Sequence, residues 1–143
     1  MTGHRYVLLV LTLVGVAACV GGTDTPAVTV WDAQLAAAPA HPDVGGTGAA
    51  VSDPTGTAVS VLLTGAEPGA AHVWGVRIGS CGVPGAQFGP SSDYPVLAVD
   101  AIGQAGADTH LGPRLSLDET YYVEIRESAD DDTRVACGDL IPR

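Results

Sequence analysis

The sequence predicts an all-β domain, a Greek-key β-sandwich or barrel of seven to eight antiparallel strands. Runs of strand length recur at short, regular intervals along the chain, and turns rich in Gly, Pro and Asp separate them. Helical periodicity is almost absent, and this combination is typical of sandwiches and small barrels.

Eight segments carry this pattern. The predicted strands are residues 27–35, 47–52, 56–65, 70–81, 96–102, 106–112, 121–128 and 134–140. The turns "DPTG" and "AEPGA" have hairpin length, so the second, third and fourth strands are expected to form an antiparallel meander. Residues 36–48 are rich in turn formers, residues 82–95 are predicted as a long loop without a regular period, and "SLDET" (116–120) as one helical turn.

Alternation of side chains assigns the faces of two of these strands. In residues 70–81 the predicted core face carries His72, Trp74, Val76 and Ile78, and the outward face carries Val73, Gly75 and Arg77. In residues 121–128 the core face carries Tyr121, Val123 and Ile125, and the outward face carries Tyr122, Glu124 and Arg126. The outward faces therefore present arginines shortly before the segments that hold the cysteines.

The N-terminal segment has the pattern of an export signal. "MTGHRYVLLVLTLVGVAAC" has a basic start at Arg5, an apolar run and small residues before Cys19. "VAAC" resembles the lipobox of bacterial lipoproteins, which implies cleavage after residue 18, lipid on Cys19 and attachment to a membrane. The alternative is an ordinary signal peptide cut after an Ala-x-Ala-like site. Residues 1–18 are therefore predicted as a signal peptide, residues 19–26 as a tether and residues 27–143 as one domain.

The net charge of the chain argues against one class of partner. The chain has six basic residues, none of them lysine, against 16 acids, for a formal net charge of −10. Nucleic acid is therefore not an expected partner, because phosphate binding needs a basic footprint. The predicted location is the cell envelope, with the protein anchored by lipid at its periplasmic or extracellular face.

The cysteine count points to a disulfide. If Cys19 carries lipid, Cys81 and Cys137 remain in an oxidising compartment, where pairing is the natural outcome. The alternatives are two free thiols or a two-cysteine metal site, although the close spacing of a metal motif is lacking.

The segment from His72 to Leu140 resembles the copper–zinc superoxide dismutase superfamily, and in particular its small secreted bacterial members. The matching features are a strand that ends in a loop cysteine, a long loop containing Gly-Pro, "RESADD" (126–131) and "RVACGDL" (134–140). The resemblance implies that fold, a bond between Cys81 and Cys137, a metal-site role for Asp130 in orienting histidines, and guidance of an anionic substrate by Arg134.

The departures from that family concern its metals. The family's histidine pair corresponds to Gly75 and Arg77, and its late histidine to Arg126. Residues 82–95, the counterpart of the zinc-binding loop, contain no histidine, and their one carboxylate belongs to Asp93. Glycine and guanidinium cannot supply the nitrogen ligands that redox copper needs. We therefore expect no enzyme activity and no copper or zinc cofactor.

Three histidines outside the predicted signal peptide and an acidic run are the remaining candidates for a metal site. We expect His41, His72 and His110 to be hydrogen-bonded or solvated, with a displaced metal site at His72 and His110 as the alternative. Asp130, Asp131 and Asp132 are expected to form a solvated loop, because a calcium site needs more oxygen ligands than one short run offers.

Arg77, Arg126 and Arg134, with Asp130 nearby, form the candidate binding site. Their guanidinium groups could bind a small anion or the carboxylate of a protein partner. The simpler interpretation is internal pairing with Glu124, Glu127, Asp130 and Asp131.

Taken together, the sequence predicts a non-enzymatic, lipid-anchored envelope protein that binds or presents another molecule. A divergent copper- or zinc-binding metalloprotein is the alternative, and a purely structural envelope lipoprotein is a third possibility.

Overall fold

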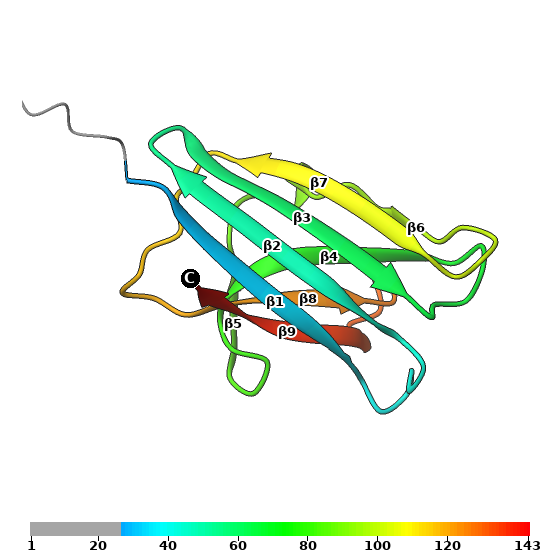
Figure 1. Ribbon diagram of the computed structural model, residues 1–143. Coiled ribbons are helices and arrows are strands. Elements are labelled where there is room, and N and C mark those ends of the chain that lie inside the picture. Colours follow the sequence, from blue (N-terminus) through cyan, green and yellow to red (C-terminus); the bar gives the residue numbers. More distant parts are fainter. Residues whose placement is uncertain (1–26) are drawn as a thin grey trace, which may run out of the picture.

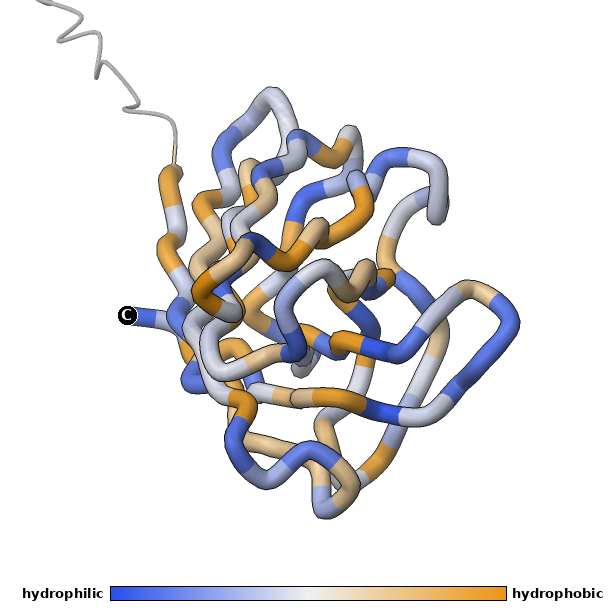
Figure 2. Tube along the Cα trace, turned by 90° about the vertical axis from the view of Figure 1, so that its right-hand side faces the viewer, coloured by the Kyte–Doolittle hydropathy of each residue, from blue (hydrophilic) through white to orange (hydrophobic). Residues whose placement is uncertain are grey.

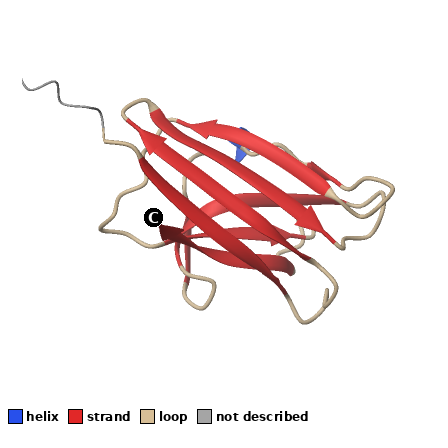
Figure 3. Ribbon diagram, in the orientation of Figure 1, coloured by secondary structure: helices blue, strands red, loops and turns tan. Residues whose placement is uncertain are grey.

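The computed structural model describes residues 27–143, which form an all-β domain, as predicted (Figures 1 and 3). The signal peptide predicted at residues 1–18, the lipid site at Cys19 and the tether at 19–26 lie outside the described residues. Within the described range, no helix has the length and apolar character needed to cross a membrane.

Nine strands and one short helix make up the domain. They are β1 (Thr29–Ala37), β2 (Gly45–Asp53), β3 (Gly56–Thr64), β4 (Ala71–Gly79), β5 (Pro84–Gln87), η1 (Ser91–Asp93), β6 (Leu97–Ala98), β7 (Ala105–Leu111), β8 (Tyr121–Arg126) and β9 (Arg134–Pro142). Each predicted strand has a counterpart, but β6 is only two residues long. Two expectations for loops are wrong: residues 82–95 contain β5 and η1, and residues 116–120 form a non-helical turn.

The strands form one antiparallel sheet that curls into two layers (Figure 1). Their order is β5-β4-β8-β9-β1-β2-β3-β7, with β6 beside β4. Strand β9 pairs with β8 on one side and with β1 on the other, so it joins the two layers. The chain leaves the layer of β1, β2 and β3 after β3, returns to it at β7 and leaves it again after β7, and such long connections are typical of Greek-key folds.

The core lies between the layers and follows the two-residue period, which Figure 2 shows as alternating apolar and polar colour along the strands. Trp74 and Val76 of β4 belong to the core, as predicted. Tyr121, Val123 and Ile125 of β8 do as well. Ile78 is an exception: it is 36% exposed, since β4 has an irregular register near its end, where it pairs with the short β5.

The outward face of β8 is also covered. Tyr122 is fully buried and Glu124 is only 9% exposed, although alternation places both away from the core. Residues 80–96 form the cover on the β4 side: a Cβ atom placed on Gly75 would contact Gln87 and Tyr94. The face that carries the arginines is thus partly enclosed.

Polar contacts fix this covering segment in place. Trp74 Nε1 donates a hydrogen bond to the carbonyl oxygen of Pro95 at 2.7 Å, and the Trp74 and Tyr94 rings meet edge to face. The Tyr94 hydroxyl donates to the carbonyl oxygen of Phe88. Burial raises the pKa of Tyr94 to about 12, so the phenol keeps the proton that it donates.

The loop between β3 and β4 offers a matched test of the packing. Gly65 and Gly69 both have positive φ angles, of 72° and 82°. A Cβ atom on Gly65 would lie 2.0 Å from the carbonyl oxygen of Asp43, whereas one on Gly69 meets nothing within 4 Å. Gly69→Ala should cost about 1–2 kcal/mol for the left-handed backbone, and Gly65→Ala about 1–3 kcal/mol more because backbone must move. Urea unfolding measures both, and equal losses would contradict the packing described.

Candidate functional site

The three predicted arginines lie around one hollow on the outward face of β4, β8 and β9. Arg77 belongs to β4, Arg126 ends β8 and Arg134 begins β9. The hollow has a volume of about 320 Å³, and its lining residues are Arg77, Pro84, Glu124, Arg126, Asp132 and Arg134. We call this hollow the arginine pocket.

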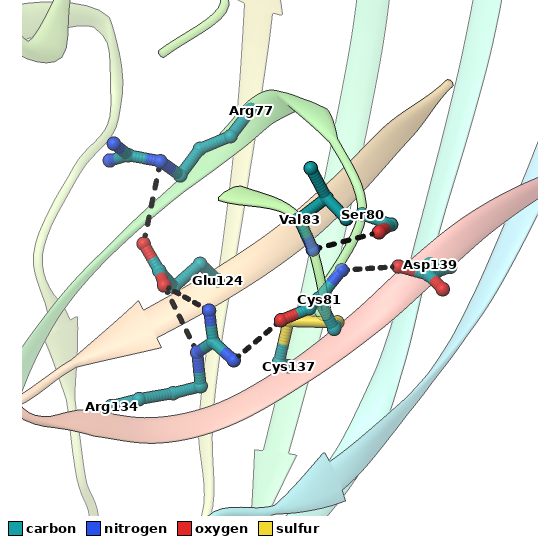
Figure 4. The surroundings of a disulfide bond; sticks show 8 residues. All are labelled: Arg77, Ser80, Cys81, Val83, Glu124, Arg134, Cys137 and Asp139. Atoms are coloured by element: carbon teal, nitrogen blue, oxygen red, sulfur yellow. Dashed lines mark hydrogen bonds and ion pairs between the residues drawn. A yellow bond between two sulfur atoms is a disulfide. The ribbon is translucent and has the colours of Figure 1, made fainter. Parts of the chain in front are cut away.

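Glu124 is the centre of the ion pairs in the arginine pocket (Figure 4). Its Oε1 atom accepts hydrogen bonds from Arg134 Nε at 3.0 Å and from Arg134 Nη2 at 2.9 Å. Its Oε2 atom lies 3.5 Å from Arg77 Nε, which also donates to the carbonyl oxygen of Gly85 at 3.1 Å. One nearly buried carboxylate thus holds two guanidinium groups from the two neighbouring strands.

The acidic loop before β9 supplies few ion-pair partners to the three arginines. Arg126 pairs with Asp132, which is almost fully exposed. Asp130 is exposed and forms no hydrogen bond or ion pair with any residue of the described range. Hydrogen bonds from the Thr133 side chain and backbone hold the pKa of Asp131 below its ordinary value, so this carboxylate caps its own loop. Of the four acids expected to pair with the arginines, Glu124 alone does so.

The arginine pocket keeps unused hydrogen-bond donors. Its three guanidinium groups face two carboxylates, which leaves an excess of one positive charge on a chain of net charge −10. Arg77 uses only its Nε atom, and Figure 4 shows both terminal nitrogens directed away from Glu124. Such forked donors match the oxygens of carboxylates and phosphates.

The expected disulfide between Cys81 and Cys137 lies beside Arg134, and it ties the loop after β4 to β9 (Figure 4). The Cys81 amide donates to Asp139 Oδ1 at 2.7 Å, and the Cys81 carbonyl accepts from Arg134 Nη1 at 2.9 Å. Arg134 is therefore positioned by Glu124 on one side and by the disulfide loop on the other.

The histidines do not form the displaced site considered from the sequence. His72 is the second residue of β4, whereas His110 belongs to β7 in the other layer and lies beside Gly56. His41 Nε2 lies 2.7 Å from Glu127 Oε1, while His72 Nδ1 is 3.6 Å from Glu127 Oε2. The buried Nδ1 of His72 lacks a hydrogen-bond partner, so the expectation that each histidine is satisfied is wrong for this atom. Across residues 27–143, no group of three or more His, Cys, Asp or Glu side chains is arranged to hold a metal ion.

Sequence reasoning missed Asp132, Asp139 and the contact between His41 and Glu127. Asp132 was assigned only to a solvated loop, and the partner of Asp139 is a backbone amide 58 residues away. His41 lies in the loop between β1 and β2, far in sequence from β8. These contacts depend on how distant loops meet, and a local pattern carries no signal for that.

Glu124→Gln tests the central ion pairs. The change keeps the shape of the side chain but leaves two guanidinium groups beside a neutral amide in a mostly buried position. We expect a loss of about 2–3 kcal/mol in the free energy of unfolding. Asp32→Asn is the matched control, because it breaks an exposed pair with Arg143 and should cost at most about 1 kcal/mol. Denaturant unfolding of both variants measures these losses, and equal losses of stability would refute the central role of Glu124.

Removing the disulfide tests how much the bond between Cys81 and Cys137 stabilises the domain. Cys81 and Cys137 are separated by 56 residues, so replacing both by alanine should cost about 4 kcal/mol of stability in the chain-entropy account. Thermal unfolding of the oxidised protein, the reduced protein and the double variant measures this. A reduced protein as stable as the oxidised one would show that the bond contributes nothing.

Comparison with known proteins assigns no family. No family model matches the chain, and no curated protein is significantly similar to it. The function must therefore be argued from the residues of the candidate site.

Proposed function

We propose that this chain is a non-enzymatic, lipid-anchored protein of the bacterial cell envelope whose β-domain binds an anionic group at the arginine pocket. In this proposal the domain is a superoxide dismutase-like scaffold without copper and zinc ligands. Its support is the "VAAC" signal pattern, the motifs around Cys81 and Cys137, and the all-β fold.

The excess positive charge of the arginine pocket is the observation that carries the binding function. Three guanidinium groups converge on two carboxylates, and the terminal nitrogens of Arg77 form no hydrogen bond with the described residues. A guanidinium without a full set of acceptors at a surface hollow favours the binding of an oxyanion.

The chemistry of the same positions argues against redox metal chemistry. Gly75, Arg77 and Arg126 stand where the resemblance expects imidazoles, and none of them offers a nitrogen lone pair at physiological pH. An arginine-lined hollow also repels cations, whereas it attracts anions.

Titration with inorganic phosphate and with acetate tests the anion site. The Nε–Hε NMR signals of Arg77 and Arg134 should shift and saturate, and Arg77→Gln should weaken binding about tenfold by removing a charge-assisted contact. Arg143→Gln is the control, because Arg143 pairs with Asp32 outside the pocket. The absence of a saturable shift below millimolar anion would contradict binding.

Elemental analysis tests the absence of a metal site. About one copper or zinc per chain, retained after incubation with both metals and desalting, would contradict the metal-free proposal.

A further inference from the structure

A second hollow, of about 550 Å³, lies directly beside the arginine pocket and shares Arg134 with it. Its lining residues are Ala36, Ala37, Ala38, Pro39, Ala40, Cys81, Thr133, Arg134 and Cys137. The end of β1, the loop after it and the disulfide supply most of this wall. We call this hollow the alanine pocket.

Apart from Arg134 and the hydroxyl group of Thr133, the side chains that line the alanine pocket are apolar. Alanine methyl groups, a proline ring and the disulfide sulfurs surround the space, and no carboxylate lines it. An apolar ligand group that enters this pocket binds favourably because it leaves water. A charged group binds favourably only if it reaches the guanidinium group of Arg134 at the edge.

Arg134 has hydrogen-bonding capacity left for a ligand at this edge. Its Nε and Nη2 atoms donate to Glu124, and its Nη1 atom donates to the Cys81 carbonyl. A guanidinium group carries five N–H bonds, so each terminal nitrogen of Arg134 keeps one that those contacts do not use. Glu124 and the disulfide loop hold the group still, which lowers the entropy lost on binding.

We propose that the anion bound here is the C-terminal carboxylate of a peptide that ends in an apolar residue. The carboxylate pairs with Arg134, and the last side chain lies in the alanine pocket. In a peptide these two groups are attached to the same carbon atom, which matches the contact between the two pockets. This inference rests on the proposed anion site.

Strand pairing favours binding of a chain end over addition of a strand. The pocket is bordered by β1 and β9, and each of these strands already pairs on both sides. A peptide therefore finds no open backbone edge here and must be held through its terminus and side chain. The net charge of −10 also disfavours long acidic segments and favours a single terminal carboxylate.

The test compares four probes on the full chain, isolated as the producing cell makes it. They are the acetylated peptide Gly-Ala-Leu with a free carboxylate, the same peptide as its amide, acetate, and decanoate. The Nε–Hε signal of Arg134 reports the carboxylate, and alanine methyl signals report the apolar group. We expect the free-acid peptide to shift both and to bind at least tenfold more tightly than either its amide or acetate.

Variants of the pocket wall test the apolar contact separately. Ala40 is exposed in its loop, so Ala40→Gln should fold normally and weaken the peptide at least tenfold by placing a polar, uncharged side chain in the apolar hollow, while acetate binding changes little. Ala36→Gln is the second variant, and Ala101→Gln is the control, because it adds the same side chain at an exposed turn that does not line the pocket.

Each outcome separates this inference from the proposed function. If acetate or phosphate binds and the peptide gains nothing over acetate, the anion site stands and the peptide proposal is overturned. Binding of decanoate but not of the peptide also overturns it, in favour of a fatty-acid site. If no probe binds, both the inference and the proposed anion site are wrong.

Discussion

The carboxylate of Glu124 is the group on which the outward face of the second layer depends. It is nearly buried and points away from the core, so its charge is costly unless cations surround it. Arg134 and Arg77 supply those cations from the two strands that flank β8. The cross-strand positions of the arginines are therefore required by the carboxylate between them, whatever else the arginines bind.

The disulfide loop extends this arrangement from side chains to backbone. Arg134 bridges the Glu124 carboxylate and the Cys81 carbonyl, and Asp139 accepts a hydrogen bond from the Cys81 amide. Both polar backbone groups of Cys81 are thus satisfied by side chains of β9, the strand to which Cys137 also belongs. The disulfide bond and these hydrogen bonds all hold the short loop that contains Cys81, so several contacts fix its position relative to Arg134.

The parts that the sequence could predict are those set by local periodicity or by counting. Alternation predicted the core positions of Trp74 in β4 and Val123 in β8, because successive side chains of a strand point to opposite faces. The burial of Tyr122 was not predictable in this way, since alternation places its side chain on the outward face of β8. Strand β5 was missed because it has only four residues and begins with Pro84, a residue that usually argues against a strand. Contacts between distant loops, such as the one that His41 makes, left no local pattern to find.

The fixed charge of arginine distinguishes this pocket from one built of histidines. A neutral imidazole offers a lone pair to a metal, whereas a guanidinium stays protonated and offers only N–H donors. Arg77, Arg126 and Arg134 therefore present donors on three adjacent strands, and Glu124 and Asp132 compensate only part of their charge. Because the compensation from Glu124 is fixed in place, the remaining donors are held in position before a ligand arrives. This rigid array of donors, with an apolar hollow beside it, is the basis of the proposal that the site takes a terminal carboxylate together with an apolar side chain.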